Sequence, residues 1–598
     1  MCGIAGLMST DSATPAMTVL NAMADALAHR GPDGHGTYAQ ADVAMVQTRL
    51  AIIDLQTGDQ PLFAPAHGAK DRDGDAELAL VANGEIYNYV ELRAARSGID
   101  FRTGSDCETA LYLYREQGID FAEHLRGMYA IAIHDPVEQT LTLARDPFGI
   151  KPLYYGLTED GFAFASEAQA LLKAGLAAPK ISPTKRDELL ALQFTTGAET
   201  VFDGIYRVLP GETLVVKAGR IVSRKIIAAL PPGPPRKETE AVALRRFDEV
   251  IEDAVNIHQR SDVPYGMFLS GGIDSSVILA VMRRLNAEPV HAMTAGFPGT
   301  DAHDERGHAR AVAEVCRAHY DEIAVTGDDF WRTLPAIAAA MDDPAADYAV
   351  LPTYLLAELA RKRGLKVVLS GEGGDEIFGG YSRYRRSARL RLLGGRPMRA
   401  RAILDGADVL LHDPVGWRNG IAIAEAEAKR YGRSALQAAQ ATDCADWLPN
   451  DLLTKLDRCL MAHGVEGRVP FLDPGVADFG FALADRLKVK HGRGKWLLRK
   501  WLETALPECK PFSKKRGFTV PVGDWIAEKG AKLGPLVAAQ PGIADVCDAS
   551  AVERLFAAGA DQGKAQWTLL FYALWHRHHI EGASASGDVF DVLAEGRR

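Results

Sequence analysis

Long apolar runs, metal-spaced cysteines and an excess of positive charge are all missing from this 598-residue sequence. No apolar stretch approaches the ~18 residues needed to span a bilayer, so no membrane partner is expected. The seven cysteines, at positions 2, 107, 316, 444, 459, 509 and 547, show neither metal-ligand spacing nor a disulfide framework. The 68 Lys plus Arg and 78 Asp plus Glu leave a net charge of −10, which argues against nucleic acid as a partner.

A targeting segment and a disordered composition are missing as well. The chain begins with no basic region ahead of its short apolar stretch, so no signal peptide is predicted and a cytoplasmic location is expected. Hydrophobic residues make up 47% of the chain and charged residues 24%, which is typical of a globular protein. At roughly 150 residues per domain, the length allows two to four domains.

A proline-rich connector at 231–235 divides the chain into two parts with different periodicity. The first part predicts short strands separated by turn residues, at 43–47, 78–81, 128–134, 140–144, 153–155 and 162–165. Two helices are expected among them, at 17–29 and 108–117. The second part opens with a helical pattern over 238–258 and then alternates strands with helices, which is typical of a parallel sheet. The strands are expected at 267–269, 291–295 and 366–369, and the helices at 277–285, 306–319 and 351–363.

Cys2 stands where removal of Met1 would make it the first residue. An N-terminal cysteine carries its own base, because its α-amine has an ordinary pKa of ~7.7–8 and can accept the thiol proton. A buried, inert cysteine is the alternative and, for an isolated cysteine, the more common case. Cys2 is therefore a candidate nucleophile that needs further residues to support it.

Four other residues have side chains or backbone groups that can bind a charged small molecule or stabilise an oxyanion. Arg49 can bind a carboxylate with two hydrogen bonds, and Asp106 can pair with an ammonium group. The side-chain amide of Asn83 and the backbone N–H of Gly84 can stabilise an oxyanion, and glycine allows a close backbone approach. The alternatives are surface ion pairs for Arg49 and Asp106 and a hairpin turn for Asn83-Gly84.

Together with Cys2-Gly3-Ile4, the segments 29–33, 49–53, 83–88 and 103–108 resemble the glutaminase domain of class II glutamine amidotransferases. The resemblance covers residues 2–210 and implies an N-terminal-nucleophile hydrolase fold, an αββα sandwich. It implies catalysis by Cys2, Asn83 and Gly84. It also implies a glutamine-binding set formed by Arg49, Leu50, Ala51, Ile52, Ile53, Asn83, Gly84, Glu85 and Asp106.

A second site is indicated by two glycine-rich loops that each follow an expected strand. The loop Ser270–Ser276 presents backbone N–H groups and hydroxyls to an anion and leads into a helix N-terminus. It is not a Walker loop, because no Gly-Lys-Ser/Thr follows at the required spacing. In the loop 369–376, Asp375 joins Asp274 as a hard oxygen donor suited to Mg²⁺ on phosphates. Either aspartate is alternatively a helix cap.

These loops resemble the pyrophosphatase loops of adenylating enzymes and, with 464–473 and 492–500, the glutamine-dependent asparagine synthetase family. The resemblance implies an α/β multidomain protein, whose residues 238–525 form a parallel-sheet ATP-pyrophosphatase domain related to adenine nucleotide α-hydrolases. It also implies ATP and Mg²⁺, aspartate activated as β-aspartyl-AMP, and ammonia carried internally from glutamine. The implied ATP-binding residues are Leu269, Ser270, Gly271, Gly272, Asp274, Ser275, Ser276, Ala295, Ser370 and Gly371. Glu372 and Lys495 are implied as catalytic residues, and Asp274 and Asp375 as metal ligands.

Some segments depart from the family pattern. Residues 341–353 lack the Thr-Thr typical of members with established substrates, which leaves open a different carboxylate acceptor in a peptide, antibiotic or surface-polysaccharide pathway. The arginine-rich stretch after Tyr384 opens an expected solvated helical insertion over 385–457, with a docking surface for an acidic partner as the alternative. A linker is expected at 211–237, a helical extension at 526–598, and a homodimer as a candidate assembly.

Overall fold

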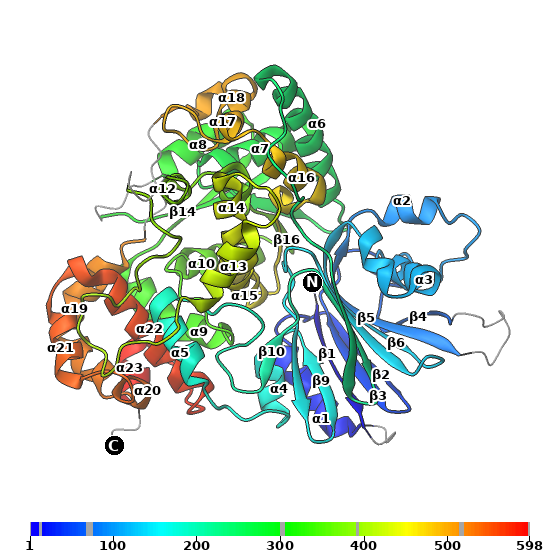
Figure 1. Cartoon of the computed structure of the whole chain (residues 1–598), viewed down its shortest axis with the longest axis horizontal. Coiled ribbons are helices and arrows are strands. Elements are labelled where there is room, and N and C mark those ends of the chain that lie inside the picture. Colours follow the sequence, from blue (N-terminus) through cyan, green and yellow to red (C-terminus); the bar gives the residue numbers. More distant parts are fainter. Residues whose placement is uncertain are drawn as a thin grey trace.

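The computed structural model describes residues 2–10, 15–66, 76–299, 305–389, 394–513 and 520–595. Two bodies lie side by side, a β-rich part from the N-terminal residues and a larger α/β part, and the last helices are grouped at the lower left of the view (Figure 1). Within the described residues, no helix is both long and apolar enough to cross a membrane.

The N-terminal part is a sandwich of two six-stranded antiparallel sheets, ordered β10-β8-β9-β1-β3-β2 and β12-β11-β7-β6-β5-β4. Ile4, Met45, Val81 and Ala130 lie in the core between the sheets. Helices α1 (Met17–Leu27) and α4 (Ala168–Lys173) cover one sheet, and α3 (Glu108–Gln117) covers the other. This confirms the expected αββα sandwich. The strands are β1 (Gly3–Ser9), β2 (Gly34–Gln40), β3 (Val43–Arg49), β4 (Leu62–Pro65), β5 (Glu77–Ile86), β6 (Gly127–Asp135), β7 (Thr140–Arg145), β8 (Tyr154–Thr158), β9 (Gly161–Ala165), β10 (Ile205–Arg207), β11 (Glu212–Lys217) and β12 (Arg220–Ile226).

The second part is built on a five-stranded, all-parallel sheet ordered β15-β14-β13-β16-β17. Its strands are β13 (Tyr265–Phe268), β14 (His291–Gly296), β15 (His319–Ala324), β16 (Val367–Leu369) and β17 (Glu466–Arg468). Because β13 and β16 are neighbours, the loops that follow them meet at one edge of the sheet, where α/β proteins bind ligands. The expected parallel-sheet domain is confirmed.

Helices pack around this sheet. The first of them, α6 (Glu240–His258), begins at the N-cap Thr239, whose side chain accepts a hydrogen bond from the N–H of Val242, and it buries Phe247 and Ile251. The others in this part are α7 (Ile273–Leu285), α8 (Arg306–Val315), α9 (Gly327–Ala340), α10 (Val350–Lys362), α11 (Gly374–Phe378), α12 (Ser382–Ser387), α13 (Asn419–Ala428), α14 (Ala435–Thr442), α15 (Thr454–Met461), α16 (Pro474–Ala482), α17 (Asp485–Lys488) and α18 (Trp496–Ala505). Two more, α2 (Tyr89–Ala94) and α5 (Pro183–Leu192), belong to the N-terminal half.

The C-terminal helices are α19 (Val522–Ala538), α20 (Pro541–Ala544), α21 (Ala549–Ala557), α22 (Gly563–His579) and α23 (Val589–Ala594). Helix α22 is buried on all sides over most of its length. The indole N–H groups of Trp567 and Trp575 donate to the carbonyl oxygens of Ala346 and Met341 at 2.6 and 2.9 Å. The C-terminal helices therefore pack against the segment 341–353 and hold its backbone by hydrogen bonds from α22.

Two expected boundaries were wrong. Residues 212–226 form β11 and β12, which complete the second sheet beside β7, so the linker begins after Ile226 and not at 211. The helix expected over 306–319 ends at Val315, and β15 begins at His319. Arg317 lies between them at φ +55°, a left-handed conformation that a right-handed helix cannot continue through.

The expected solvated insertion over 385–457 was also wrong for its second half. Helix α14, the π-helical segment Asp443–Leu453 and α15 are almost entirely buried. Arg399, one of the clustered arginines, packs over the rings of Phe194 and Trp447. These charged residues resemble a solvated face in the sequence because their partners come from distant segments.

The interface between the two parts contains a cluster of fully buried ion pairs. Arg30 contacts Glu167 at 2.6 Å and Asp457 at 2.8 Å, while Arg458 contacts Asp457 at 3.0 Å and Asp342 at 2.6 Å. Burial alone would raise the pKa of Asp457, but Arg30 and Arg458 outweigh it and hold the pKa below its ordinary value. These charges join the sandwich to α15.

We expect Asp457→Ala to lower the free energy of unfolding by about 3 kcal/mol, because Arg30 and Arg458 lose a buried partner. Denaturant unfolding of the purified protein measures the change. Asp203→Ala is the matched control, since Asp203 pairs with Lys180 on the surface at 2.7 Å and both side chains are mainly exposed. Equal stability of the Asp457 and Asp203 variants would contradict the importance of the buried cluster.

Candidate functional site

Cys2 lies directly before β1 and is buried, with 8% of its surface exposed. Its thiol accepts a hydrogen bond from Gln47 Nε2 at 3.0 Å, its carbonyl accepts one from Arg30 Nε at 3.2 Å, and its N–H donates to Asn83 Oδ1 at 3.1 Å. Burial raises the pKa of the thiol, and the positive charge of Arg49 acts in the opposite direction. A reaction at this sulfur therefore requires a base to take its proton.

Asn83 and Gly84 lie inside β5, so they do not form a hairpin turn. Asn83 is fully buried, and its Nδ2 has no hydrogen-bond partner in the part of the chain that the structure describes. The same Asn83 side chain therefore accepts a hydrogen bond from the Cys2 N–H through Oδ1 and has an unsatisfied donor at Nδ2. A side chain at Gly84 would approach the carbonyl oxygen of Met128 to 2.2 Å, so the neighbouring strand β6 requires glycine there.

Arg49 and Asp106 lie near Cys2 and Asn83. Arg49, at the end of β3, donates to the carbonyl of Asp54 at 2.5 Å and contacts Asp59 at 2.7 Å. Asp106 is buried, which raises its pKa, and it accepts a hydrogen bond from the N–H of Ile86 at 2.6 Å. Both are mainly buried, which contradicts a surface ion pair for Asp106, whereas Arg49 pairs with the largely exposed Asp59.

The other residues expected to bind glutamine flank this group. Leu50 and Ile52 are buried, while Ala51 and Ile53 are partly exposed. Glu85 is buried 3.4 Å from Arg468 of the second domain. Burial, Glu466 and Asp106 raise the pKa of Glu85.

Sequence reasoning missed Gln47 and Arg30 in this site. Gln47 pairs with Ile4 in the register between β1 and β3, which brings its amide to the thiol of Cys2. The expected strand at 43–47 contained Gln47, but no local signal showed which strand lies beside it.

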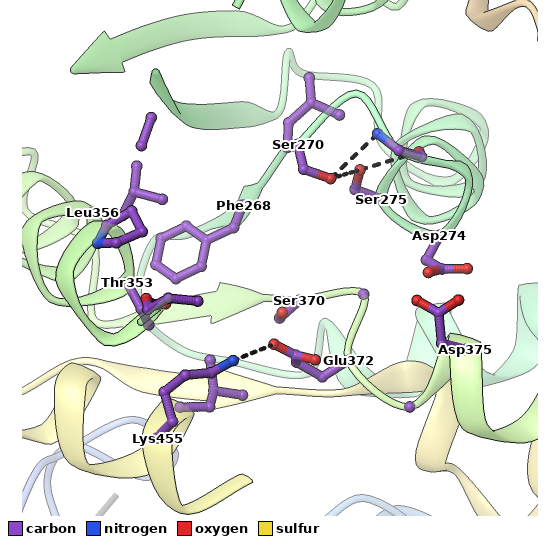
Figure 2. A pocket seen from close by; sticks show the side chains of 18 of the residues that line it. Phe268, Ser270, Asp274, Ser275, Thr353, Leu356, Ser370, Glu372, Asp375 and Lys455 are labelled. Atoms are coloured by element: carbon purple, nitrogen blue, oxygen red, sulfur yellow. Dashed lines mark hydrogen bonds and ion pairs between the residues drawn. The ribbon is translucent and has the colours of Figure 1, made fainter. Parts of the chain in front are cut away.

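The second site is a cavity of about 270 Å³ beyond the ends of β13 and β16 (Figure 2). Gly271 turns the first loop at φ +70°, and α7 begins at Ile273. The Ser270 hydroxyl accepts from the N–H of Gly272 at 3.2 Å and lies 3.1 Å from the Ser275 hydroxyl. Serine hydroxyls and a helix N-terminus therefore face the cavity, an arrangement that suits a phosphate group.

The structure brings most of the predicted nucleotide residues to this one cavity. Those that line it are Leu269, Ser270, Gly272, Asp274, Ser275, Ala295, Ser370, Gly371, Glu372 and Asp375. Gly271, Ser276 and Lys495 do not line it. A Cβ at Gly271 would face His308 at 3.1 Å, and Ser276 is buried within α7.

Lys495 holds the two predicted metal ligands together. Its ammonium contacts Asp274 and lies 2.6 Å from Asp375 Oδ1. Burial alone would lower the pKa of Lys495, but the two carboxylates outweigh it and raise the pKa to about 12. A Cβ at Gly380 would come within 2.4 Å of Lys495 Cε, so glycine leaves the space that this lysine occupies.

Sequence reasoning missed Lys455, which forms part of one wall of the cavity. Lys455 reaches it from α15, in the segment expected to be solvated, with Nζ 3.2 Å from Asp347 and 3.6 Å from Glu372. Ala349 and Thr353, from the segment 341–353, line the cavity as well. In the sequence, Lys455 is one basic residue in a segment of mixed charge, and nothing else distinguishes it.

Comparison with known proteins agrees with the two-part architecture. Residues 1–226 match the model of the glutamine amidotransferase domain, and residues 246–577 match the model described as asparagine synthase. The second match includes most of the C-terminal helices, so these helices are not an addition to the family pattern.

The chain is also similar to curated proteins over most of its length. It is 31% identical over 634 residues to asparagine synthetase (glutamine-hydrolyzing) 1 of Bacillus subtilis (strain 168), covering 97% of each chain. It is 29% identical over 549 residues to the glutamine-hydrolyzing asparagine synthetase B of Escherichia coli (strain K12), covering 88% of this chain and 83% of that one. The chain belongs to the asparagine synthase family and carries an N-terminal glutamine amidotransferase domain.

Proposed function

We propose that this protein is a glutamine-hydrolysing asparagine synthetase. It releases ammonia from glutamine at Cys2 and uses ATP and aspartate at the second site to form asparagine, AMP and pyrophosphate. The observation that carries the proposal is the presence of both reactive constellations in one chain, joined through α15. Asp457 of this helix binds the arginine that holds Cys2, and Lys455 lines the cavity.

The first half-reaction is a nucleophilic attack by the Cys2 thiolate on the side-chain amide of glutamine. Once Met1 is removed, the α-amine of Cys2 accepts the thiol proton, since burial disfavours the free thiolate. The unsatisfied Nδ2 of Asn83 and the N–H of Gly84 stabilise the oxyanion, and ammonia leaves as the thioester forms. Water then releases glutamate. Arg49 and Asp106 are positioned for the carboxylate and the ammonium of glutamine.

The second half-reaction has two steps. The β-carboxylate of aspartate attacks the α-phosphorus of ATP, forming a P–O bond as pyrophosphate leaves. Ammonia then attacks the acyl carbon of β-aspartyl-AMP, and AMP leaves with its oxygen. The loop 270–276 and the N-terminus of α7 bind phosphate oxygens. Lys495 balances charge at Asp274 and Asp375, and Glu372 lies in the cavity to assist the acyl step.

The donor set also fits Mg²⁺. Asp274 and Asp375 supply two carboxylates at the phosphate end of the cavity, and Mg²⁺ commonly takes one or two carboxylates and completes its octahedron with phosphate oxygens and water. When bound, the ion would reduce repulsion between ATP and these carboxylates.

We expect Cys2→Ala to abolish asparagine formation from glutamine while leaving formation from ammonium chloride near the wild-type rate. The second site does not use the thiol, so external ammonia replaces the first half-reaction. A coupled pyrophosphate assay with each nitrogen source measures the effect. Loss of the ammonia-dependent activity in a folded Cys2→Ala protein would contradict the two-site scheme.

Lys495→Met is expected to show the opposite selectivity. Asp274 and Asp375 would face each other without the ammonium between them, so pyrophosphate release should fall at least ~100-fold with either nitrogen source. Glutamate release from glutamine should persist, because Lys495 lies in the other domain. Loss of glutaminase activity together with synthetase activity would show a folding defect and not a local one.

The acceptor is tested by product analysis with purified enzyme, ATP, Mg²⁺, glutamine and a panel of carboxylates. We expect AMP, pyrophosphate and asparagine with aspartate, and no pyrophosphate above background with glutamate or succinate. Silence with aspartate would instead favour amidation of another carboxylate, the alternative left open by the segment 341–353. Mass spectrometry of the products distinguishes the two outcomes.

A further inference from the structure

Strand β3 carries a polar side chain where its pattern calls for an apolar one. Every residue of β3 is buried, and side chains two positions apart share one face of a strand. Val43 and Met45 lie in the core between the two sheets, and Gln47 is the next position on that face. Gln47 is only 1% exposed. An amide is costly to bury unless it finds hydrogen-bond partners, so its partners indicate its role.

The amide of Gln47 lies between two acceptors. Its Nε2 donates to the Sγ of Cys2 at 3.0 Å and lies 3.5 Å from the carbonyl oxygen of Ala82. A carbonyl oxygen can only accept, so Ala82 fixes the nitrogen end of the amide at this place. The group that faces the sulfur is therefore an N–H donor.

This donor favours one protonation state of the sulfur. A thiolate accepts a hydrogen bond more strongly than a thiol does, so an N–H aimed at the sulfur stabilises the anion. A hydrogen bond from the backbone N–H of Leu50 acts in the same direction on the pKa of the Cys2 thiol. Both donors oppose the effect of burial, which raises that pKa.

The other groups around Cys2 carry or can gain a charge. The titratable and charged groups that face it in the described chain are the amino terminus, Arg30 after α1, Arg49 at the end of β3, Glu85 in β5 and Cys107 before α3. The amino terminus and Arg49 lower the pKa of the thiol, whereas Glu85 raises it. Gln47 differs from all of these groups because its amide is uncharged at every pH, so its effect on the sulfur does not titrate.

We propose that Gln47 is a catalytic residue of the glutaminase site, which stabilises the Cys2 sulfur as its anion while the α-amine holds the proton. The sulfur then forms a bond to the amide carbon of glutamine, and the electron pair of the C=O bond moves onto oxygen. At that stage the charge passes from the N–H of Gln47 to the oxyanion donors Asn83 and Gly84. The assignment rests on the proposed function and deepens it.

A second buried glutamine provides the matched control. The pairing of β4 with β5 ends at Leu62 and Leu80, so the backbone of Ala82 lies beyond it. There the N–H of Ala82 donates to Gln60 Oε1 at 2.6 Å, while Gln47 lies near the carbonyl of the same residue. Gln60→Met therefore removes a buried amide from the same stretch of backbone and leaves the donor to the sulfur in place.

Gln47→Met removes the donor and keeps the length of the side chain. We expect the midpoint of the pH profile for alkylation of Cys2 by iodoacetamide, in which the sulfur displaces iodide, to rise by about one unit. Below this midpoint, kcat/KM for glutamine hydrolysis should fall by about 3- to 10-fold, because less thiolate is present and the greater basicity of the remaining thiolate offsets part of the loss. Above the midpoint the loss should disappear. Peptide mass spectrometry follows Cys2 separately from the other cysteines.

Gln47→Asn is a second variant, which retains a buried amide but is one methylene too short to reach the sulfur. It should shift the alkylation profile in the same direction. An unshifted profile in both variants, or an equal shift in Gln60→Met, would overturn the assignment and make Gln47 a structural partner of Ala82. Absence of glutamate release from glutamine by the wild-type enzyme would instead overturn the proposed function itself.

Discussion

The contact between Arg30 and Asp457, 2.8 Å apart and fully buried, is the interaction on which both sites depend. Buried charges of this kind cost several kcal/mol each unless they are paired, so the two domains have a strong preference for the one docking geometry that pairs them. Glu167, Arg458 and Asp342 extend the same network. Because Arg30 Nε also donates to the carbonyl of Cys2, the domain interface positions Cys2, the proposed nucleophile.

Helix α15 carries this constraint to the second site. Successive residues of an α-helix are separated by about 100°, so Lys455 and Asp457 point to nearly opposite sides. Asp457 faces the sandwich, and Lys455 faces the cavity. A single buried helix therefore determines the place of the Cys2 carbonyl and of the cavity cation together. Helix α15 thus contributes contacts to both sites, through Asp457 on one side and Lys455 on the other.

The sequence predicted the elements that local chemistry specifies. Period-two strands such as β7, the N-capped α6 and the loop 270–276 were all recognisable, because each is encoded by residues a few positions apart. What failed were features that depend on distant partners. β11 and β12 pair with each other in a local hairpin, but their place in the second sheet depends on the distant strand β7. The charged residues of 443–458 looked solvated because Arg30, Glu372 and Asp347 are their partners only in the folded protein. The contact of Gln47 with Cys2 could not be predicted either, because it depends on the pairing of β3 with β1.

The net charge of −10 raises a physical problem for a protein that binds the ATP polyanion. The cavity does not attract ATP through an excess of basic side chains, because four of the residues that line it are acidic, namely Asp274, Glu372, Asp375 and Glu376. Burial raises the pKa of Glu376 to about 8, with Asp375 and Glu372 adding to the effect, so this carboxyl is mostly protonated at neutral pH. The single positive charge of Lys495 offsets one of the two negative charges of Asp274 and Asp375. In the proposed scheme, backbone N–H groups and hydroxyls of the loop 270–276 bind phosphate without adding a formal charge. In the proposed scheme, an acidic chain therefore accommodates ATP through two buried lysines at different places: Lys495 lies between Asp274 and Asp375, and Lys455 lines the cavity near Glu372.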